Sequence, residues 1–136
     1  MATLKEILLW IPAGLIPLFN GAVRILTYQK MVGEEAAVIF SSASDLILIF
    51  AYACMVQRWR PSEKQTQAIG RGLLWFGLST SLHFALGLLV FGTSLYEVVN
   101  KYNIVAGETW GLISIFILFA PLLAKRLLHH ELPGRH

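Results

Sequence analysis

The chain has 136 residues, of which 56% are hydrophobic and only 14% are charged. A soluble domain usually carries about 25% charged residues, so this composition excludes an ordinary water-soluble domain. The formal net charge of +3 comes from basic residues scattered at the ends of apolar segments, which argues against nucleic-acid binding. The single cysteine, Cys54, excludes an internal disulfide and a multi-cysteine metal site.

Four apolar segments, each close to the roughly 20 residues that cross a bilayer, occupy most of the chain. They predict transmembrane helices over residues 7–28, 36–57, 72–98 and 110–128. The first contains Pro12 and Pro17 and the fourth Pro121, which membrane helices tolerate where neighbouring helices satisfy the freed carbonyl groups. The expected fold is all-α, with four transmembrane helices in an antiparallel bundle that forms a single domain over residues 1–136.

Basic residues are divided unevenly between the two sides of this bundle. The side of the termini holds Lys5, Arg58, Arg60, Lys64, Arg71, Lys125, Arg126 and Arg135, whereas the other side holds only Arg24, Lys30 and Lys101. The cytoplasmic side of a membrane retains the excess of positive residues. We therefore expect a multi-pass protein of a bacterial-type inner membrane with both termini in the cytoplasm.

Polar side chains inside the spans are the first candidates for a functional site, because ionisable groups in a bilayer are costly without partners. At about 1.5 Å per residue, Asn20 and Asp45 lie about 12–14 Å below the outer end, and His83 about 15 Å below it. We expect these three side chains to meet near the midplane. Asp45 is then either a structural acid or a proton or cation site.

Arg24 lies about one turn below the outer end of the first span, and Glu34, Glu35 and Glu108 are expected at the same end. One interpretation is an ion pair between Arg24 and a glutamate, which would join the outer ends of the helices. The alternative is that the Arg24 guanidinium binds an anionic head group or substrate.

Small residues recur every four positions on the third span, at Gly77, Ser81 and Ala85. This pattern lets membrane helices approach closely, so we expect that face to pack against a helix of the same chain or of a partner. Aromatic residues near the span ends are typical interface anchors. They are Trp10, Trp59, Trp110, Tyr28, Tyr96 and Tyr102.

A further interpretation of His83 is an axial ligand for a haem or a magnesium pigment. The other histidines, His129, His130 and His136, all lie near the C-terminus, where we expect a solvated tail. We predict no other cofactor, no metal site and no catalytic residue, since the sequence carries no motif for nucleophilic catalysis, a metal cluster or a phosphate loop.

Several segments together resemble a family of small four-helix bacterial membrane proteins with no established activity. They are residues 20–24, 33–37, 72–78, 102–110 and 120–127. The resemblance implies the fold and the compartment only. Members of that family carry an acid where this chain has His83, so the resemblance favours Asn20, Arg24, Glu34 and Asn103 as shared functional residues.

Three functions are compatible with these features. The first is a non-enzymatic integral membrane protein, either an accessory subunit or a bundle that binds a lipid or a partner. The second is a small transporter or channel that uses Asp45 and His83, for which four helices require at least a dimer. The third is a pigment or haem protein that uses His83. Partners are expected to be the lipid bilayer and a homo-oligomer or a larger membrane complex.

Overall fold

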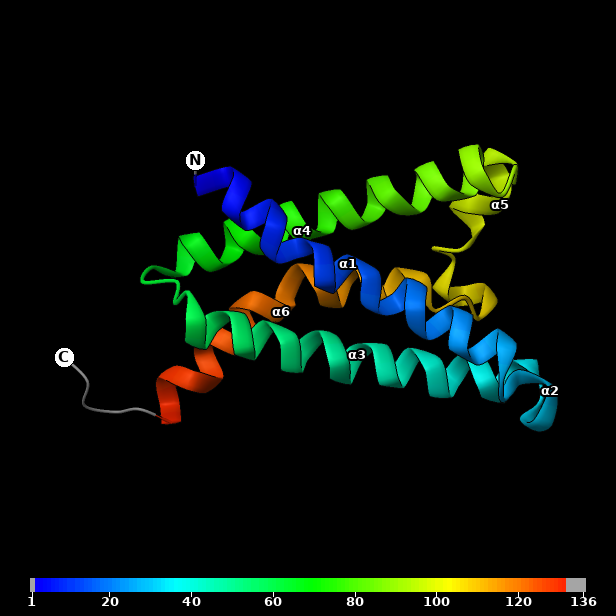
Figure 1. Ribbon diagram of the computed structural model, residues 1–136, viewed down its shortest axis with the longest axis horizontal. Coiled ribbons are helices and arrows are strands. Elements are labelled where there is room, and N and C mark those ends of the chain that lie inside the picture. Colours follow the sequence, from blue (N-terminus) through cyan, green and yellow to red (C-terminus); the bar gives the residue numbers. More distant parts are fainter. Residues whose placement is uncertain (1, 132–136) are drawn as a thin grey trace.

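The computed structural model describes residues 2–131, and every regular element in this range is helical (Figure 1). The elements are α1 (Ala2–Leu26), α2 (Gln29–Val32), α3 (Glu34–Trp59), α4 (Gln65–Ala85), the π-helical turn η1 (Leu86–Val90), α5 (Leu95–Asn100), the 3₁₀ turn η2 (Ile104–Ala106) and α6 (Trp110–Glu131). Four stretches are long and apolar enough to cross a membrane, namely Thr3–Leu26, Glu34–Trp59, Gln65–Val90 and Trp110–His130. The protein is therefore a multi-pass helical membrane protein.

The four long helices alternate in direction along the chain, which confirms the antiparallel arrangement (Figure 1). Both ends of the described chain lie at one end of the bundle, together with the loop between α3 and α4. We call this the terminal end. The opposite end, which holds α2 and α5, is the distal end.

In cross-section the helices follow the order α1, α3, α6, α4. Two antiparallel pairs, α1 with α3 and α4 with α6, form helical hairpins. The hairpins contact each other through parallel neighbours, because α1 lies beside α4 and α3 lies beside α6. The short loop over residues 60–64 therefore joins two helices that lie diagonally across the bundle.

Large apolar side chains fill the centre of the bundle. Those that are fully buried include Trp75, Ile49, Ile117 and Val56. Small residues allow the helices to approach one another, and they include Ala13, Ala53, Ala120 and Ala124. The closest approach joins α4 and α6, where a Cβ atom at Gly72 would lie 2.0 Å from the backbone oxygen of Leu118. Only glycine fits this crossing without displacing a helix.

The helix of the third span starts and ends earlier than the range of 72–98 expected from hydropathy. The helix α4 begins at Gln65, and its helical continuation ends at Val90. The early start follows from capping: the Gln67 side chain accepts hydrogen bonds from the backbone N–H groups of Glu63 and Lys64, at 2.9 and 3.2 Å. These bonds satisfy backbone donors near the helix start in a polar segment that hydropathy does not detect.

At its other end, the same helix stops inside an apolar run. Gly92 has a φ of 63°, a left-handed conformation that favours glycine. The Thr93 hydroxyl donates a hydrogen bond of 2.7 Å to the carbonyl of Gly87. Because the helix ends at Val90, His83 lies about 10 Å from the distal end, closer than predicted.

A charged residue marks α5 as lying outside the membrane. The Glu97 carboxylate accepts hydrogen bonds from the Ser94 backbone N–H, at 2.8 Å, and from the Ser94 hydroxyl, at 3.1 Å. These bonds lower the pKa of the Glu97 carboxyl below its ordinary value. A carboxylate is costly in the hydrocarbon layer, and α5 follows the end of the candidate span at Val90, so we assign α5 to the connection between the third and fourth spans.

The end of the third span can be tested by thiol labelling in a Cys54→Ala background. A membrane-impermeant maleimide is expected to label Glu97→Cys rapidly, because that position is exposed outside the hydrocarbon. Leu73→Cys, which is 56% exposed but lies within the span, should resist labelling. Equal protection of both positions would show that the span continues to residue 98.

Candidate functional site

Asn20 and Asp45 meet inside the bundle, between α1 and α3. The Asn20 Nδ2 atom donates to Asp45 Oδ1 at 2.9 Å and to the backbone oxygen of Ser41 at 2.9 Å. Asp45 is only 4% exposed, and it shares the buried face of α3 with Ala37, Ser41 and Ile49, which recur every four residues. The carboxylate is therefore a buried acid with an amide partner on the next helix.

Arg24 lies one turn beyond Asn20 on α1, and its positive charge interacts with the carboxylate of Asp45. The side chain is half-buried, and its Nε atom is buried without a hydrogen bond. Asn20, Arg24 and Asp45 thus form one polar group in the distal half of the bundle. We call these three residues the membrane acid site.

Among residues 2–131, the three glutamates expected at the same end as Arg24 do not pair with it. Glu108 accepts a salt bridge from Lys101 Nζ, at 3.2 Å. Glu34 and Glu35 lie exposed in the first turn of α3. In the described part of the chain, none of the three forms an ion pair with Arg24.

His83 lies apart from Asp45, in a cluster at the distal end that we call the distal aromatic cluster: His83, Phe84, Tyr102 and Trp110. The rings of His83 and Trp110 have centroids 4.5 Å apart, and those of His83 and Tyr102 are 5.4 Å apart. Trp110 Nε1 donates to the Tyr102 hydroxyl at 2.8 Å. The Tyr102 hydroxyl can then donate its own proton to His83 Nδ1, 3.0 Å away.

This arrangement gives His83 a structural partner and provides no argument for a haem or pigment ligand. Tyr102 comes from the connection between spans, and its burial raises the pKa of the phenol, an effect that the hydrogen bond from Trp110 opposes. The cluster therefore attaches that connection to α4 and α6. In residues 2–131, no group of three His, Cys, Asp or Glu side chains is placed to hold a metal ion. His136 of the expected solvated tail lies outside the described residues.

The small-residue face of α4 points out of the bundle. Gly77, Ser81 and Ala85 are all exposed, and a Cβ atom at Gly77 would meet no atom within 4 Å. Gly70, two turns before Gly77, is also exposed and equally open. No helix in the described part of the chain covers this face, so within one molecule it faces lipid or a second polypeptide.

Five of the six aromatic residues expected as interface anchors divide into two groups, and the sixth, Tyr28, is half-buried at the start of α2. Trp59 and Tyr96 are 70% and 79% exposed, near the ends of the bundle. Trp10 instead joins two helices, since its Nε1 atom donates to Ser79 Oγ at 2.8 Å. Trp110 and Tyr102 are also hydrogen-bonded inside the protein. These three aromatic residues therefore make specific contacts within the bundle.

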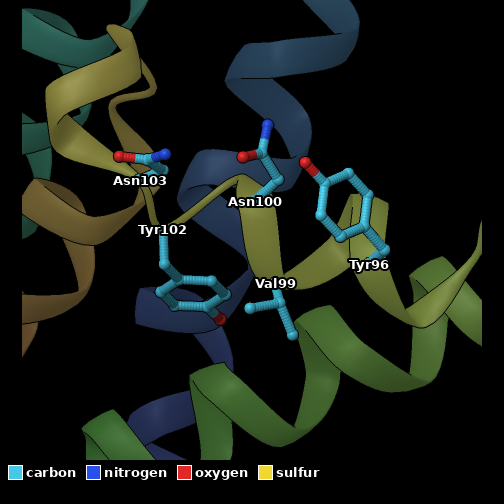
Figure 2. Close-up of a pocket in the computed structure, with 5 residues that line it drawn as sticks. All are labelled: Tyr96, Val99, Asn100, Tyr102 and Asn103. Carbon is cyan, nitrogen blue, oxygen red and sulfur yellow. The ribbon is translucent and has the colours of Figure 1, made fainter.

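An open hollow of about 350 Å³ lies at the distal end (Figure 2). It is lined by Tyr96, Val99, Asn100, Tyr102 and Asn103. Asn103 uses its Oδ1 atom to cap η2 through the Ala106 N–H, at 3.2 Å. No residue of the membrane acid site lines this hollow, so the two features are separate.

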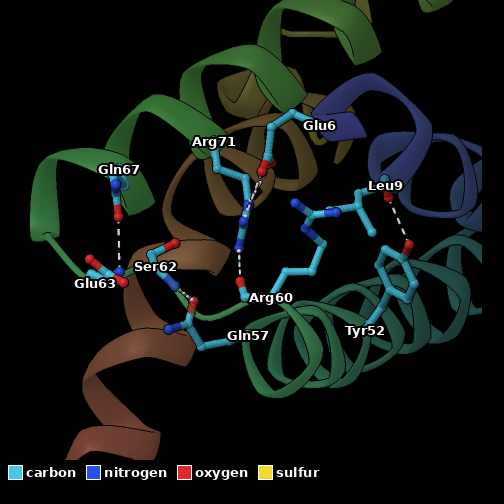
Figure 3. Close-up of polar contacts among 9 residues, drawn as sticks. All are labelled: Glu6, Leu9, Tyr52, Gln57, Arg60, Ser62, Glu63, Gln67 and Arg71. Atoms are coloured by element: carbon cyan, nitrogen blue, oxygen red, sulfur yellow. Dashed lines mark hydrogen bonds and ion pairs between the residues drawn. The ribbon is translucent and has the colours of Figure 1, made fainter. Parts of the chain in front are cut away.

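An ion pair at the terminal end was not foreseen from the sequence. Arg71 Nε and Nη2 donate to the two carboxylate oxygens of Glu6, at 2.7 and 2.9 Å, and Arg71 Nη1 donates to the backbone oxygen of Arg60 at 3.2 Å (Figure 3). The Arg71 side chain is 7% exposed and that of Glu6 is 25% exposed. We call Glu6, Arg71 and the Arg60 carbonyl the terminal clamp. The only signal in the sequence was an acid and a base at the same predicted end of the first and third spans.

The loop beside the terminal clamp is held from two further helices. The buried Gln57 side chain of α3 accepts a hydrogen bond from the Ser62 backbone N–H, at 3.2 Å (Figure 3). Lys125 of α6 donates to the backbone oxygens of Ser62 and Glu63. All four long helices therefore contribute a polar contact at the terminal end.

Comparisons with protein-family models, with curated proteins and with solved structures gave no match.

The terminal clamp can be tested by removing one charge. Glu6→Gln is expected to lower the free energy of unfolding in detergent micelles by about 2–4 kcal/mol, because it leaves the buried Arg71 guanidinium without its counter-charge. Lys5→Gln is the matched control, since its side chain is exposed and its loss should cost less than about 0.5 kcal/mol. Similar losses for the two variants would mean that the ion pair makes no specific contribution.

Proposed function

We propose that the protein is a non-enzymatic subunit of a membrane complex, and that the exposed face of α4 binds a transmembrane helix of another polypeptide. The observation that carries this proposal is the exposure of Gly77, Ser81 and Ala85 on one face that no helix of this chain covers. Small residues at this spacing allow two helix backbones to approach closely in a bilayer. Contact with lipid alone does not explain these small residues, because bulky apolar side chains would contact lipid equally well.

The filled interior supports a function at the surface. The centre of the bundle is occupied by side chains such as Trp75 and Ile117, which are 0% exposed. The hollow beside Tyr102 lies at the distal end, and another hollow, lined by residues of α6 and the α3–α4 loop, lies at the terminal end. The outer faces of the helices are therefore the largest surfaces offered to a partner.

We also propose in which membrane the protein lies and which side of that membrane holds the two termini. The excess of basic residues at the terminal end favours a bacterial-type inner membrane with both termini in the cytoplasm. One of the basic residues expected on that side, Arg135, lies outside the described residues. The resemblance to small four-helix bacterial membrane proteins agrees with this compartment.

The double variant Gly77→Leu/Ser81→Leu tests the α4 face. Two leucines would separate the helix backbones, so we expect the bound partner to be reduced about tenfold, which corresponds to about 1.4 kcal/mol. The measurement is native mass spectrometry of protein gently extracted from its own membrane. It reports the mass and the composition of the complex together.

Ala51→Leu is the matched control for this experiment. Ala51 is an exposed alanine within the α3 span, so the substitution adds a leucine to a different lipid-facing surface. The proposal fails if the double variant retains the same complex mass as the wild type, or if Ala51→Leu disrupts the complex equally.

A second candidate function rests on the membrane acid site. Burying a carboxylate within a span is costly, and Asp45 is only 4% exposed. Acids that are retained inside membranes commonly mark ion or proton pathways. In this alternative, at least two copies of the chain form a small transporter, and Asp45 binds the transported cation or proton. The Asn20 amide would then orient the carboxylate through the 2.9 Å hydrogen bond.

Reconstituted protein provides the test of this alternative. Cation or proton flux is expected to fall to the background level in Asp45→Asn, which keeps the shape of the side chain and removes its charge. Glu35→Gln removes an exposed carboxylate and should leave flux unchanged. Equal flux in wild type and Asp45→Asn would exclude Asp45 from transport.

A further inference from the structure

A second hollow, of about 270 Å³, lies at the terminal end between the α3–α4 loop and the last turns of α6. It is lined by Glu63, Gln65, Leu122, Lys125, Arg126, His129 and His130. Most of these side chains are polar, and two carry a permanent positive charge. None of them belongs to the membrane acid site or to the exposed face of α4.

The wall of this hollow presents nitrogen donors. Lys125 is held in place because its ammonium group donates to the backbone oxygens of Ser62 and Glu63. Arg126 is exposed beside it, and a guanidinium offers paired N–H donors that match the oxygens of a phosphate. His129 and His130 add ring nitrogens from the following turn. The hollow is thus suited to an anion with several oxygens.

One carboxylate in the lining of the hollow disfavours anion binding. Glu63 lines the hollow, and its side chain is exposed. With Lys125 and Arg126 positive, the permanent charges of the lining still leave an excess of one positive charge. Removal of the Glu63 charge should therefore strengthen the binding of an anion, whereas removal of the Arg126 charge should weaken it.

The outer face of α6 continues from this hollow into the membrane. Ile115, Phe119, Leu122 and Arg126 follow one another at intervals of four, three and four residues, so they share one side of the helix. Ile115 and Phe119 are each 48% exposed. Arg126 lies about 24 Å along α6 from Trp110, near the edge of a hydrocarbon layer about 30 Å thick. This side of α6 is apolar within the span and basic where the span ends.

We infer that the terminal hollow binds the phosphate of an anionic phospholipid headgroup, with one acyl chain lying along Ile115, Phe119 and Leu122 of α6. Arg126 is the principal phosphate ligand, and Lys125 supports it from a fixed position. The continuity between the basic hollow and the lipid-exposed apolar face favours a lipid over a soluble phosphate compound. The inference does not depend on the α4 interface, because it concerns a different helix.

The experiment measures lipid binding to the full-length protein in detergent micelles by native mass spectrometry. Phosphatidylglycerol and phosphatidylcholine with identical acyl chains are added separately. We expect the wild type to retain phosphatidylglycerol in preference to phosphatidylcholine. Arg126→Gln should weaken the binding of phosphatidylglycerol about fivefold, the equivalent of about 1 kcal/mol for one basic residue near an anionic surface, and Glu63→Gln should strengthen it.

Two controls keep the outcome interpretable. Lys5→Gln removes one exposed positive charge at the same end of the bundle but outside the hollow, and it should leave lipid binding unchanged. Thermal unfolding of each variant checks that the bundle remains intact.

Three results would overturn the inference. Equal retention of the two lipids would exclude recognition of an anionic headgroup. Equal loss in Lys5→Gln and Arg126→Gln would assign binding to the diffuse charge of the surface. Displacement of phosphatidylglycerol by an equal concentration of inorganic phosphate would show that a free phosphate is the ligand.

Discussion

The ion pair between Glu6 and Arg71 is the constraint on which the arrangement of the two hairpins depends. It joins residues that are 65 positions apart in the chain, and it connects α1 to α4, which belong to different hairpins. The same guanidinium also holds the carbonyl of Arg60, where α3 ends. Removal of either partner would leave the other as a buried charge without a counter-charge, which is strongly destabilising. The terminal clamp therefore links the two hairpins at the terminal end, in addition to the packing of α3 against α6 and of α1 against α4.

The hydropathy of the sequence was sufficient to predict four spans, because a run of about 20 apolar residues has few alternatives to a transmembrane helix. It was not sufficient for the third boundary. Apolar residues continue through Leu95 and Val99, yet Gly92 and Ser94 end one helix and begin another. Hydropathy averages over such local backbone signals, so the expected range extends about eight residues beyond the end of the helix at Val90.

The sequence indicated which residues belong to the candidate site but only part of how they are arranged. Asn20 and Asp45 lie at matching depths on consecutive spans, so their proximity follows from the hairpin itself. The depth assigned to His83 depended on the boundary at residue 98, and the earlier end of the helix moves it to Tyr102 and Trp110. Whether Gly77 faces inward or outward depends on the rotation of α4 in the bundle. A repeat of small residues does not contain that information.

The diagonal course of the loop over residues 60–64 has a consequence for how the protein is made. Each hairpin is local in sequence, so α1 with α3 can pair in the membrane while the second half of the chain is still being synthesised. During that interval Glu6 has no guanidinium partner. The parallel contact between α1 and α4 forms only after α4 has entered the bilayer, and the contact between α3 and α6 forms only after α6 has followed. The terminal clamp is complete when Arg71 arrives beside an acid that was synthesised at the start of the chain.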